Sequence, residues 1–296
     1  MKKLLVVAML VFCLLVLSPV NPKDITYAKS LEVEDVKAVY LMDARSGQVL
    51  MEQNSEVKLP VASIVKLMTI LITLEKVDDG KINLSDKVIA SSVASGMGGS
   101  QVFLETGGEY TVDELIKSVI VCSANDASVA LSEYIAGSES SFVEIMNKRA
   151  QELGLTNTVY QNCTGLPAAG QFSCAKDMAR LLNEVIRHDK YFDYSSIWMD
   201  TLKHSAGRET ELVNTNKLIR YYNGCDGGKT GSTNEAGYCL VATAKRGNMR
   251  LIGAVLGCNS GKDRFSKTAD VLNYGFNNFI SSKIVSSEQN IDNNIL

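Results

Sequence analysis

Hydrophobic positions alternate in strand-like patterns near both ends of the chain and recur with a helical period between them. Short alternating runs at 36–42 and 48–51 flank a polar turn, which predicts an N-terminal hairpin. Similar runs return at 226–232, 237–244 and 249–256. Strands from the two chain ends most economically join one antiparallel sheet.

The middle of the chain has the pattern of packed helices. Positions 64–74 are apolar on almost all sides, which is typical of a buried helix. Thr111 and Glu114 have the spacing of a capping box before a helix that continues to Val121. Further helices are predicted at 127–135, 142–153, 173–186 (capped by Ser173) and 265–279. The predicted fold class is α+β: an antiparallel sheet with flanking helices, and an inserted helical lobe at about 85–200 across a cleft.

Two stretches show no regular period. The Gly/Ser-rich segment 91–100 predicts a flexible loop, either a plain linker or a rim of an active site. The polar stretch 204–216 is predicted to be irregular.

Composition and charge exclude some functions. The 296 residues carry a net charge of −3 without a basic stripe, which argues against nucleic acid as a partner. Two histidines and the lack of C-x-x-C spacing argue against zinc, and we expect no cofactor. Apart from Cys13, six cysteines remain, and the sequence leaves disulfides and free thiols both open; they are Cys122, Cys163, Cys174, Cys225, Cys239 and Cys258.

The N-terminus predicts export. Lys2 and Lys3 precede an apolar stretch at 4–17, and small residues end at Ala28, which is typical of a cleaved signal peptide at 1–28. We therefore expect a protein of the cell envelope or secreted medium. An uncleaved signal is the alternative, and it would give weak membrane association.

Ser63 and Lys66 are the first candidates for chemistry. Their i, i+3 spacing places both on one face of the predicted buried helix. Burial lowers the pKa of a lysine, and a lysine of low pKa can act as a base towards a serine. The alternative is structural, with Ser63 as an N-cap and Lys66 reaching the surface.

Two further motifs change that balance. Ser123-Ala124-Asn125 lies at a predicted break between helices, and Lys229-Thr230-Gly231-Ser232 lies on a glycine-rich strand. Separately they read as a helix break and a surface hairpin. In this order after Ser63-x-x-Lys66, they form the set found in penicillin-binding proteins and serine β-lactamases.

Acyl transfer gives each residue a role. We assign Ser63 as the nucleophile, Lys66 as its base and Ser123 as a proton relay to the leaving amine, with Lys229 keeping the field positive. The backbone N–H groups of Ser63 and Ser232 are expected to form the oxyanion hole.

Substrate binding is assigned to the neighbouring residues. Asn125 either orients Lys66 or binds a substrate carbonyl, while Lys229 and Thr230 bind a carboxylate. Glycines 227, 228 and 231 are expected to keep the strand edge open, so that an extended peptide can add to it.

The chain resembles the D-alanyl-D-alanine carboxypeptidases of the low-molecular-mass penicillin-binding type, serine peptidase family S11. The resemblance runs from about Val36 to Phe279, a 31–282 domain in our reading. It is carried by Tyr40-Leu41-Met42-Asp43, Pro60-Val61-Ala62-Ser63-Ile64-Val65-Lys66-Leu67-Met68-Thr69, Ser123-Ala124-Asn125-Asp126-Ala127, Asn162-Cys163-Thr164-Gly165-Leu166, Asp226-Gly227-Gly228-Lys229-Thr230-Gly231-Ser232-Thr233 and Met249-Arg250-Leu251-Ile252.

The resemblance implies removal of the terminal D-alanine from peptidoglycan stem peptides ending in D-Ala-D-Ala, through an acyl-Ser63 intermediate. It implies β-lactam antibiotics as covalent inhibitors, and Arg250 as a further contact of the substrate carboxylate. Many members continue into a C-terminal β domain and membrane anchor, which we expect to be missing here, leaving a polar tail at 283–296. Some relatives carry histidine where this chain has Ser232.

Two other functions fit parts of the pattern. A serine β-lactamase would share acylation, but its usual Glu-x-x-x-Asn loop is not matched, because Glu211 and Asn214 have the wrong spacing. A catalytically silent, penicillin-recognising sensor would not need to retain Lys66 and Ser123.

Overall fold

A five-stranded antiparallel sheet organises the computed structural model, which describes residues 31–205 and 207–281. Its strand order is β2-β1-β9-β8-β7, so that strands from both chain ends pair, as predicted. The strands are β1 (Ala38–Asp43), β2 (Val49–Gln53), β7 (Cys225–Thr233), β8 (Gly237–Arg246) and β9 (Met249–Cys258). The predicted signal peptide and polar tail lie outside the described residues.

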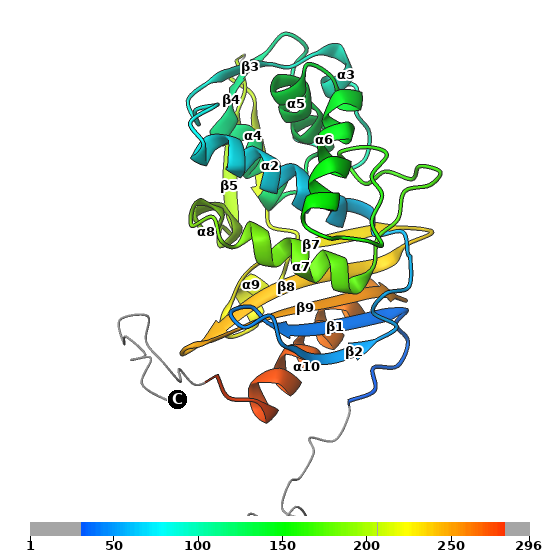
Figure 1. Cartoon of the computed structure of the whole chain (residues 1–296). Helices are drawn as coiled ribbons and strands as arrows, with labels where there is room; N and C mark the ends of the chain where they lie inside the picture. The colour runs from blue at the N-terminus through cyan, green and yellow to red at the C-terminus, as the bar shows by residue number, and fades with distance from the viewer. Residues whose placement is uncertain (1–30, 206, 282–296) are drawn as a thin grey trace, which may run out of the picture. The chain divides into compact units, whose positions relative to one another are not determined.

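The sheet is buried on both faces (Figure 1). Helix α10 (Gly261–Asn278) packs on one face with Leu240 and Val255, and α7 (Ala175–Val185) packs on the other, where Val241 and Ala254 contribute to the larger core. Alternate residues of one strand therefore enter different cores, as the pleat of a strand requires. Full burial of each large aliphatic side chain stabilises the fold by about 2 kcal/mol.

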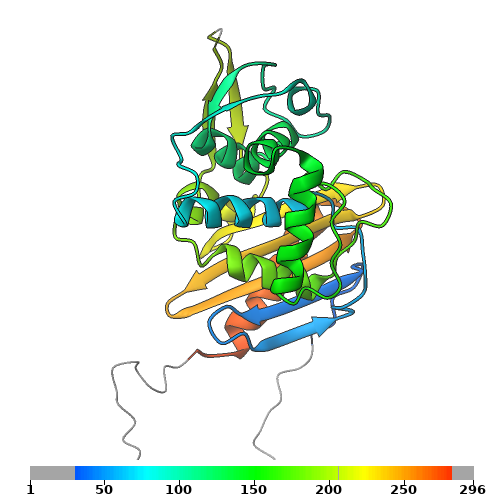
Figure 2. The ribbon, with the colours of Figure 1, turned by 45° about the horizontal axis from the view of Figure 1, so that its top comes forward.

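Helix α2 is the centre of the helical part (Figure 2). Its residues 66–74 are all buried, which confirms the prediction of a buried helix. Helices α4, α5, α6 and α7 contact it on several sides, so that its apolar residues meet protein all round. The helices are η2 (Ala62–Val65, a 3-10 turn), α2 (Lys66–Asp78), α3 (Ser92–Ser95), α4 (Val112–Val121), α5 (Asn125–Ala136), α6 (Glu139–Glu152), α8 (Lys190–Ser195) and α9 (Leu218–Tyr221).

One predicted helix start is confirmed and another is wrong. Thr111 and Glu114 form the capping box: the Glu114 N–H donates to Thr111 Oγ1 at 3.1 Å, and the Thr111 N–H donates to Glu114 Oε2 at 2.7 Å. Ser173, however, is held in a β-bridge with Leu59. Helix α7 therefore begins one residue later, with Cys174 as its N-cap.

The periodicity also missed two small hairpins. These are β3 (Lys87–Ile89) with β4 (Glu109–Thr111), and β5 (Met199–Lys203) with β6 (Glu209–Val213). Strands β5 and β6 each bury a single leucine, so their alternation is too short to stand out from the polar stretch. The Gly/Ser-rich segment similarly contains the single turn α3.

The six described cysteines are all free thiols, and every one except Cys122 is buried. Among residues 31–205 and 207–281 we find no helix with the length and apolar character needed to span a bilayer. The same residues contain no cluster of ligand-type side chains suited to a metal ion.

Candidate active site

Ser63 and Lys66 lie at the junction of η2 and α2. Ser63 is in the 3-10 turn, Lys66 is the first residue of α2, and Lys66 Nζ donates to Ser63 Oγ at 3.1 Å. The i, i+3 spacing brings both side chains to one side of the turn, as expected from the geometry of a helix.

The Lys66 ammonium is fully buried, with few partners. Besides Ser63, it donates to the carbonyl of Thr164 at 2.5 Å. Burial lowers the pKa of Lys66 from 10.5 to about 7, because the charged form loses its hydration. A large share of Lys66 is therefore neutral near pH 7 and able to take a proton.

The loop at 162–167 lies against the start of α2, where it contacts Lys66 and Thr69. Asn162 Oδ1 accepts from the N–H groups of Thr164 and Gly165, which folds the loop into a tight turn. Gly165 has φ +80°, and a Cβ there would lie 2.1 Å from the carbonyl oxygen of Ala62. Only glycine allows this approach, which places the Thr164 carbonyl on Lys66.

Ser123 and Lys229 form a second pair. Ser123 lies at the break between α4 and α5 with φ +66°, and Lys229 Nζ donates to its Oγ at 2.7 Å. Because that oxygen accepts from Lys229, the Ser123 hydroxyl proton is free for another acceptor. Burial, and then the charge of Lys66, lower the pKa of Lys229 well below its usual value.

Asn125 is held by the segment before α4. Its Nδ2 donates to the carbonyl of Gly98 at 2.7 Å, and its buried Oδ1 has no hydrogen-bond partner among the described residues. The second N–H of this amide and its oxygen therefore remain for a substrate carbonyl or an ammonium, the two roles expected from the sequence.

Strand β7 is an edge of the sheet, and η2 packs against it. A Cβ at Gly231 would lie 2.6 Å from the Val61 carbonyl oxygen and 3.0 Å from Ser63 N, so only glycine fits between the strand and the nucleophile. Thr230 is buried and Ser232 is exposed. A surface hollow begins at Ser232 and continues along the β7–β8 turn.

The upstream half of the β7 edge is not open, in contrast to expectation. The Gly228 N–H donates to Tyr191 Oη at 2.9 Å, and the Asp226 carbonyl accepts from Ser195 Oγ at 2.6 Å. These α8 side chains cover the edge at Asp226–Gly228. An added peptide strand is therefore restricted to the part of β7 that follows.

Arg250 does not join this cluster. Its guanidinium donates to both carboxylate oxygens of Asp226, each at 2.7 Å, and stacks over Phe192. At roughly 3.3 Å per residue, about 16 Å of strand separates Asp226 from Gly231. Arg250 is thus bound to a carboxylate of this chain at the other end of β7, and we leave it out of the site.

The arginine that does reach the site is Arg264, which the sequence reasoning missed. It lies in the first turn of α10, and its guanidinium donates to the Gly231 carbonyl at 3.2 Å. Burial lowers the pKa of Arg264, and its charge contributes to lowering that of Lys229. Its position just before the apolar run at 265–279 gave no periodic signal.

The site thus contains two pairs of a serine hydroxyl and a lysine amine, Ser63 with Lys66 and Ser123 with Lys229, together with Arg264. Three basic side chains are buried or half-buried around the end of β7. The positive charge that they carry favours an anionic substrate and a developing oxyanion.

Comparison with known proteins points to one family. The family model described as D-alanyl-D-alanine carboxypeptidase, peptidase family S11, matches residues 25–260. The carboxypeptidase DacF of Bacillus subtilis is 43% identical over 257 residues, covering 87% of this chain and 66% of the relative. DacC of Escherichia coli is 42% identical over 252 residues, covering 83% and 62%. The chain therefore spans less than two thirds of the length of these relatives.

Solved structures agree with this match. Penicillin-binding protein 6B from Escherichia coli superposes with a TM-score of 0.82 at 33% identity, covering 90% of this chain and 85% of that one. The antiparallel sheet with its flanking helices confirms the predicted α+β, transpeptidase-like fold. With the ordered motifs and this likeness in hand, the chain belongs to peptidase family S11, the D-alanyl-D-alanine carboxypeptidases.

Proposed function

We propose that this protein is a serine-type carboxypeptidase that removes the terminal D-alanine from peptidoglycan stem peptides. The observation that carries the proposal is the buried Lys66 amine, 3.1 Å from Ser63 Oγ and with a pKa of about 7. Membership of the family supports the choice of substrate. A hydroxyl beside such a base is suited to attack an amide carbonyl.

Acylation begins when neutral Lys66 takes the Ser63 hydroxyl proton. Ser63 Oγ then bonds to the carbonyl carbon of the penultimate D-alanine, and the carbonyl oxygen becomes an oxyanion. The backbone N–H groups of Ser63 and Ser232 are the donors proposed for it. Gly231 supports this role, because it lets β7 approach the Ser63 backbone closely.

The leaving nitrogen needs a proton before its C–N bond breaks. Ser123 is the proposed donor, since its oxygen already accepts from Lys229 and its own proton is free. The proton lost by Ser123 is replaced from the ammonium of Lys66, which returns Lys66 to its neutral form. Water then attacks the acyl-Ser63 ester while Lys66 takes a proton from it, and this proton passes to Ser63 Oγ as the ester C–O bond breaks and the shortened peptide leaves.

The terminal carboxylate fits the cationic end of β7. Arg264 and Lys229 are the proposed partners, because both are basic side chains at this part of β7: Arg264 donates to the Gly231 carbonyl, and Lys229 donates to the carbonyl of the preceding Thr230. Arginine suits a carboxylate through paired, charge-assisted hydrogen bonds. A β-lactam carries an equivalent carboxylate and a reactive amide, so we propose that it acylates Ser63 as an inhibitor.

The proposed place of action is the cell envelope or the secreted medium, supported by the signal-like sequence at 1–28. An uncleaved signal would add weak membrane association. The proposed partner is the stem peptide of the wall, with neither nucleic acid nor a cofactor required.

The decisive experiment is mass spectrometry of the intact protein with penicillin and with a diacylated peptide ending in D-Ala-D-Ala. We expect one acyl group on Ser63 and release of one D-alanine. Ser63→Ala should lose both with an unchanged circular dichroism spectrum, while Ser140→Ala, at an exposed serine of α6, should keep both. A stable penicillin adduct on Ser63→Ala would refute the assignment of the nucleophile.

The same assay separates the alternatives. A β-lactamase would release hydrolysed penicillin with rapid turnover and leave the peptide intact. A silent sensor would bind penicillin without releasing D-alanine.

A further inference from the structure

The segment at 98–104 sets how Asn125 presents its amide. The carbonyl of Gly98 accepts from Asn125 Nδ2, and the carbonyl of Ser100 accepts from the Asn125 backbone N–H, both at 2.7 Å. The Gly98 carbonyl can only accept, so the NH₂ group of the Asn125 side chain must face it. A shift of this segment would therefore let the amide rotate out of this orientation.

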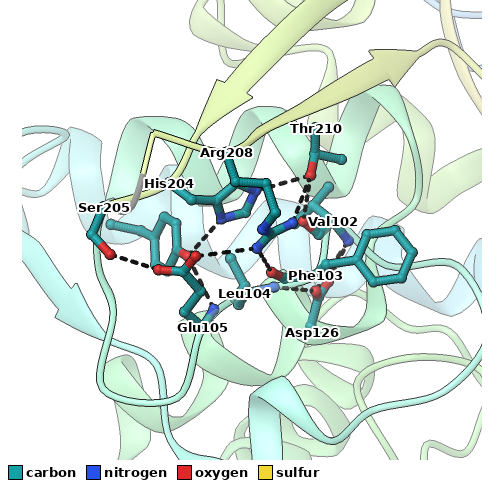
Figure 3. A network of polar contacts seen from close by, with 10 residues as sticks. Val102, Phe103, Leu104, Glu105, Asp126, His204, Ser205, Arg208 and Thr210 are labelled. Carbon is teal, nitrogen blue, oxygen red and sulfur yellow. Dashed lines mark hydrogen bonds and ion pairs between the residues drawn. The ribbon is translucent and has the colours of Figure 1, made fainter.

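Asp126 holds this segment by hydrogen bonds to its backbone. Its carboxylate is fully buried and accepts from the N–H of Val102 at 3.1 and 3.0 Å and from the N–H of Leu104 at 3.1 Å. The residue between them, Phe103 (Figure 3), has φ +59° and is 55% exposed. A bulky residue adopts this conformation only where its surroundings impose it, and here the two flanking N–H groups bonded to Asp126 do so.

His204 holds the same segment from the β5–β6 hairpin (Figure 3). Tyr110 Oη lies 2.8 Å from His204 Nδ1, and Thr210 Oγ1 lies 2.9 Å from His204 Nε2. Thr210 donates its own proton to the Val102 carbonyl, and Tyr110 Oη accepts the N–H of Glu105. Thr210 must therefore accept from Nε2–H, and Nδ1 accepts from Tyr110, which defines a neutral imidazole with both nitrogens satisfied.

Charged groups surround this imidazole. Arg208 donates to the Phe103 carbonyl at 2.5 Å and lies 3.6 Å from Glu105, which also accepts from Ser205. Burial and then the charge of Arg208 lower the pKa of His204, while the carboxylates of Glu105, Asp126 and Glu114 oppose that effect. The neutral form that the hydrogen bonds require is thus also the form favoured at pH 7.

We propose that Asp126 and His204 are positioning residues for acylation, which together clamp the 98–104 segment onto Asn125, and that protonation of His204 loosens the clamp. This inference rests on the function proposed above, because its effect is read at Ser63. A proton on Nδ1 would point at Tyr110 Oη, which already accepts from Glu105, and would leave the Tyr110 hydroxyl proton without its acceptor. It would also place a positive charge beside Arg208.

The test compares two replacements of His204 in the full chain. His204→Gln keeps one donor and one acceptor but cannot titrate, whereas His204→Phe keeps neither. The readouts are the rate of Ser63 acylation by penicillin between pH 5 and pH 9 and hydrogen exchange of the Val102 and Leu104 amides, corrected for the intrinsic effect of pH. Every variant retains Lys66, so the ratio of each variant to wild type isolates the contribution of His204.

We expect His204→Gln to acylate within about twofold of wild type at pH 8 and to be faster than wild type at pH 5, with exchange at both amides independent of pH. His204→Phe should acylate about tenfold more slowly at pH 8, with faster exchange at both amides, because two buried hydrogen bonds are lost. Faster exchange with unchanged acylation would overturn the link to Asn125. Unchanged exchange would overturn the clamp itself.

Two further measurements keep the result interpretable. The chain has only two histidines, so the imidazole signals of His204 are identified by their loss in His204→Gln, and their titration should coincide with the change in exchange. Asp126→Asn should speed exchange at Val102 and Leu104 and slow acylation; if only its overall stability changes, Asp126 is not a positioning residue. Failure to release D-alanine would refute the proposed function and leave these penicillin and exchange results standing.

Discussion

Replacing Lys66 by methionine is expected to stabilise the fold while abolishing acylation. Lys66 is fully buried, and its pKa falls from 10.5 to about 7. At about 1.4 kcal/mol for each tenfold change in proton affinity, the folded chain disfavours the ammonium by about 5 kcal/mol. Methionine has a similar length and no charge, so this term disappears.

The gain is reduced by the partners that Lys66 leaves behind. Ser63 Oγ and the Thr164 carbonyl each lose a hydrogen bond, and a buried unsatisfied carbonyl costs about 1–3 kcal/mol. The net expectation is a Lys66→Met variant about 2–4 kcal/mol more stable than wild type below pH 7. Loss of the general base should slow acylation by penicillin by a factor on the order of 10²–10⁴.

The pH dependence gives the effect its sign. The pKa of Lys66 is lower in the folded chain, so between about pH 7 and 10.5 the unfolded chain binds more protons. The stability of wild type should therefore rise with pH across this window, relative to the variant, and the advantage of Lys66→Met should shrink. The reason is that burial is costly only for the charged amine, and at higher pH Lys66 is neutral in the folded and the unfolded chain.

The assay is urea unfolding of both proteins at pH 6 and pH 10, with midpoints followed by circular dichroism. The matched control is Lys76→Met, at a half-buried lysine in the last turn of the same helix. It should show neither the gain in stability at pH 6 nor its decrease at pH 10. A Lys66→Met variant less stable than wild type at pH 6, or a difference equal at both pH values, would refute the reasoning that burial sets the basicity of Lys66.

Two further predictions concern the β7 strand. Gly231→Val should reduce the rate of acylation by at least tenfold with little change in the core. The added Cβ would lie 2.6 Å from the Val61 carbonyl oxygen and would push the strand away from Ser63. A normal acylation rate would show that η2 moves aside instead. Arg264→Gln should raise KM for a peptide with a free terminal carboxylate by about tenfold or more, whereas the matched Arg250→Gln should leave KM unchanged and lower only the unfolding midpoint. Equal KM values for the two variants would contradict the placement of the carboxylate at Arg264.

Much of the catalytic proposal was accessible from local sequence alone. The i, i+3 spacing of Ser63 and Lys66 fixes their neighbourhood because a helical turn is a short-range structure, and the surrounding apolar run implies the burial that the structure shows. The capping box at Thr111 and Glu114 is equally local. The alternating runs at both chain ends also predicted the antiparallel sheet correctly, because period-two burial is a property of the strands themselves.

Contacts between distant segments needed the tertiary structure. Ser123 and Lys229 are 106 residues apart, yet meet at 2.7 Å because α4 and α5 pack on α2 while β7 packs on η2, the turn that leads into α2. The choice between Arg250 and Arg264 likewise depended on which arginine the packing of α10 brings to Gly231 and which is neutralised by Asp226. No spacing rule encodes that difference.

The amino-acid sequence by itself determined the turn that pairs a serine with a lysine, the strands of the sheet and the family to which they point. The fold alone decided how completely the lysine is desolvated, which arginine faces the strand, and that Asp126, and His204 through Thr210, contact the segment next to Asn125. Local patterns specify local geometry, whereas desolvation and charge partners depend on atoms contributed by the whole chain.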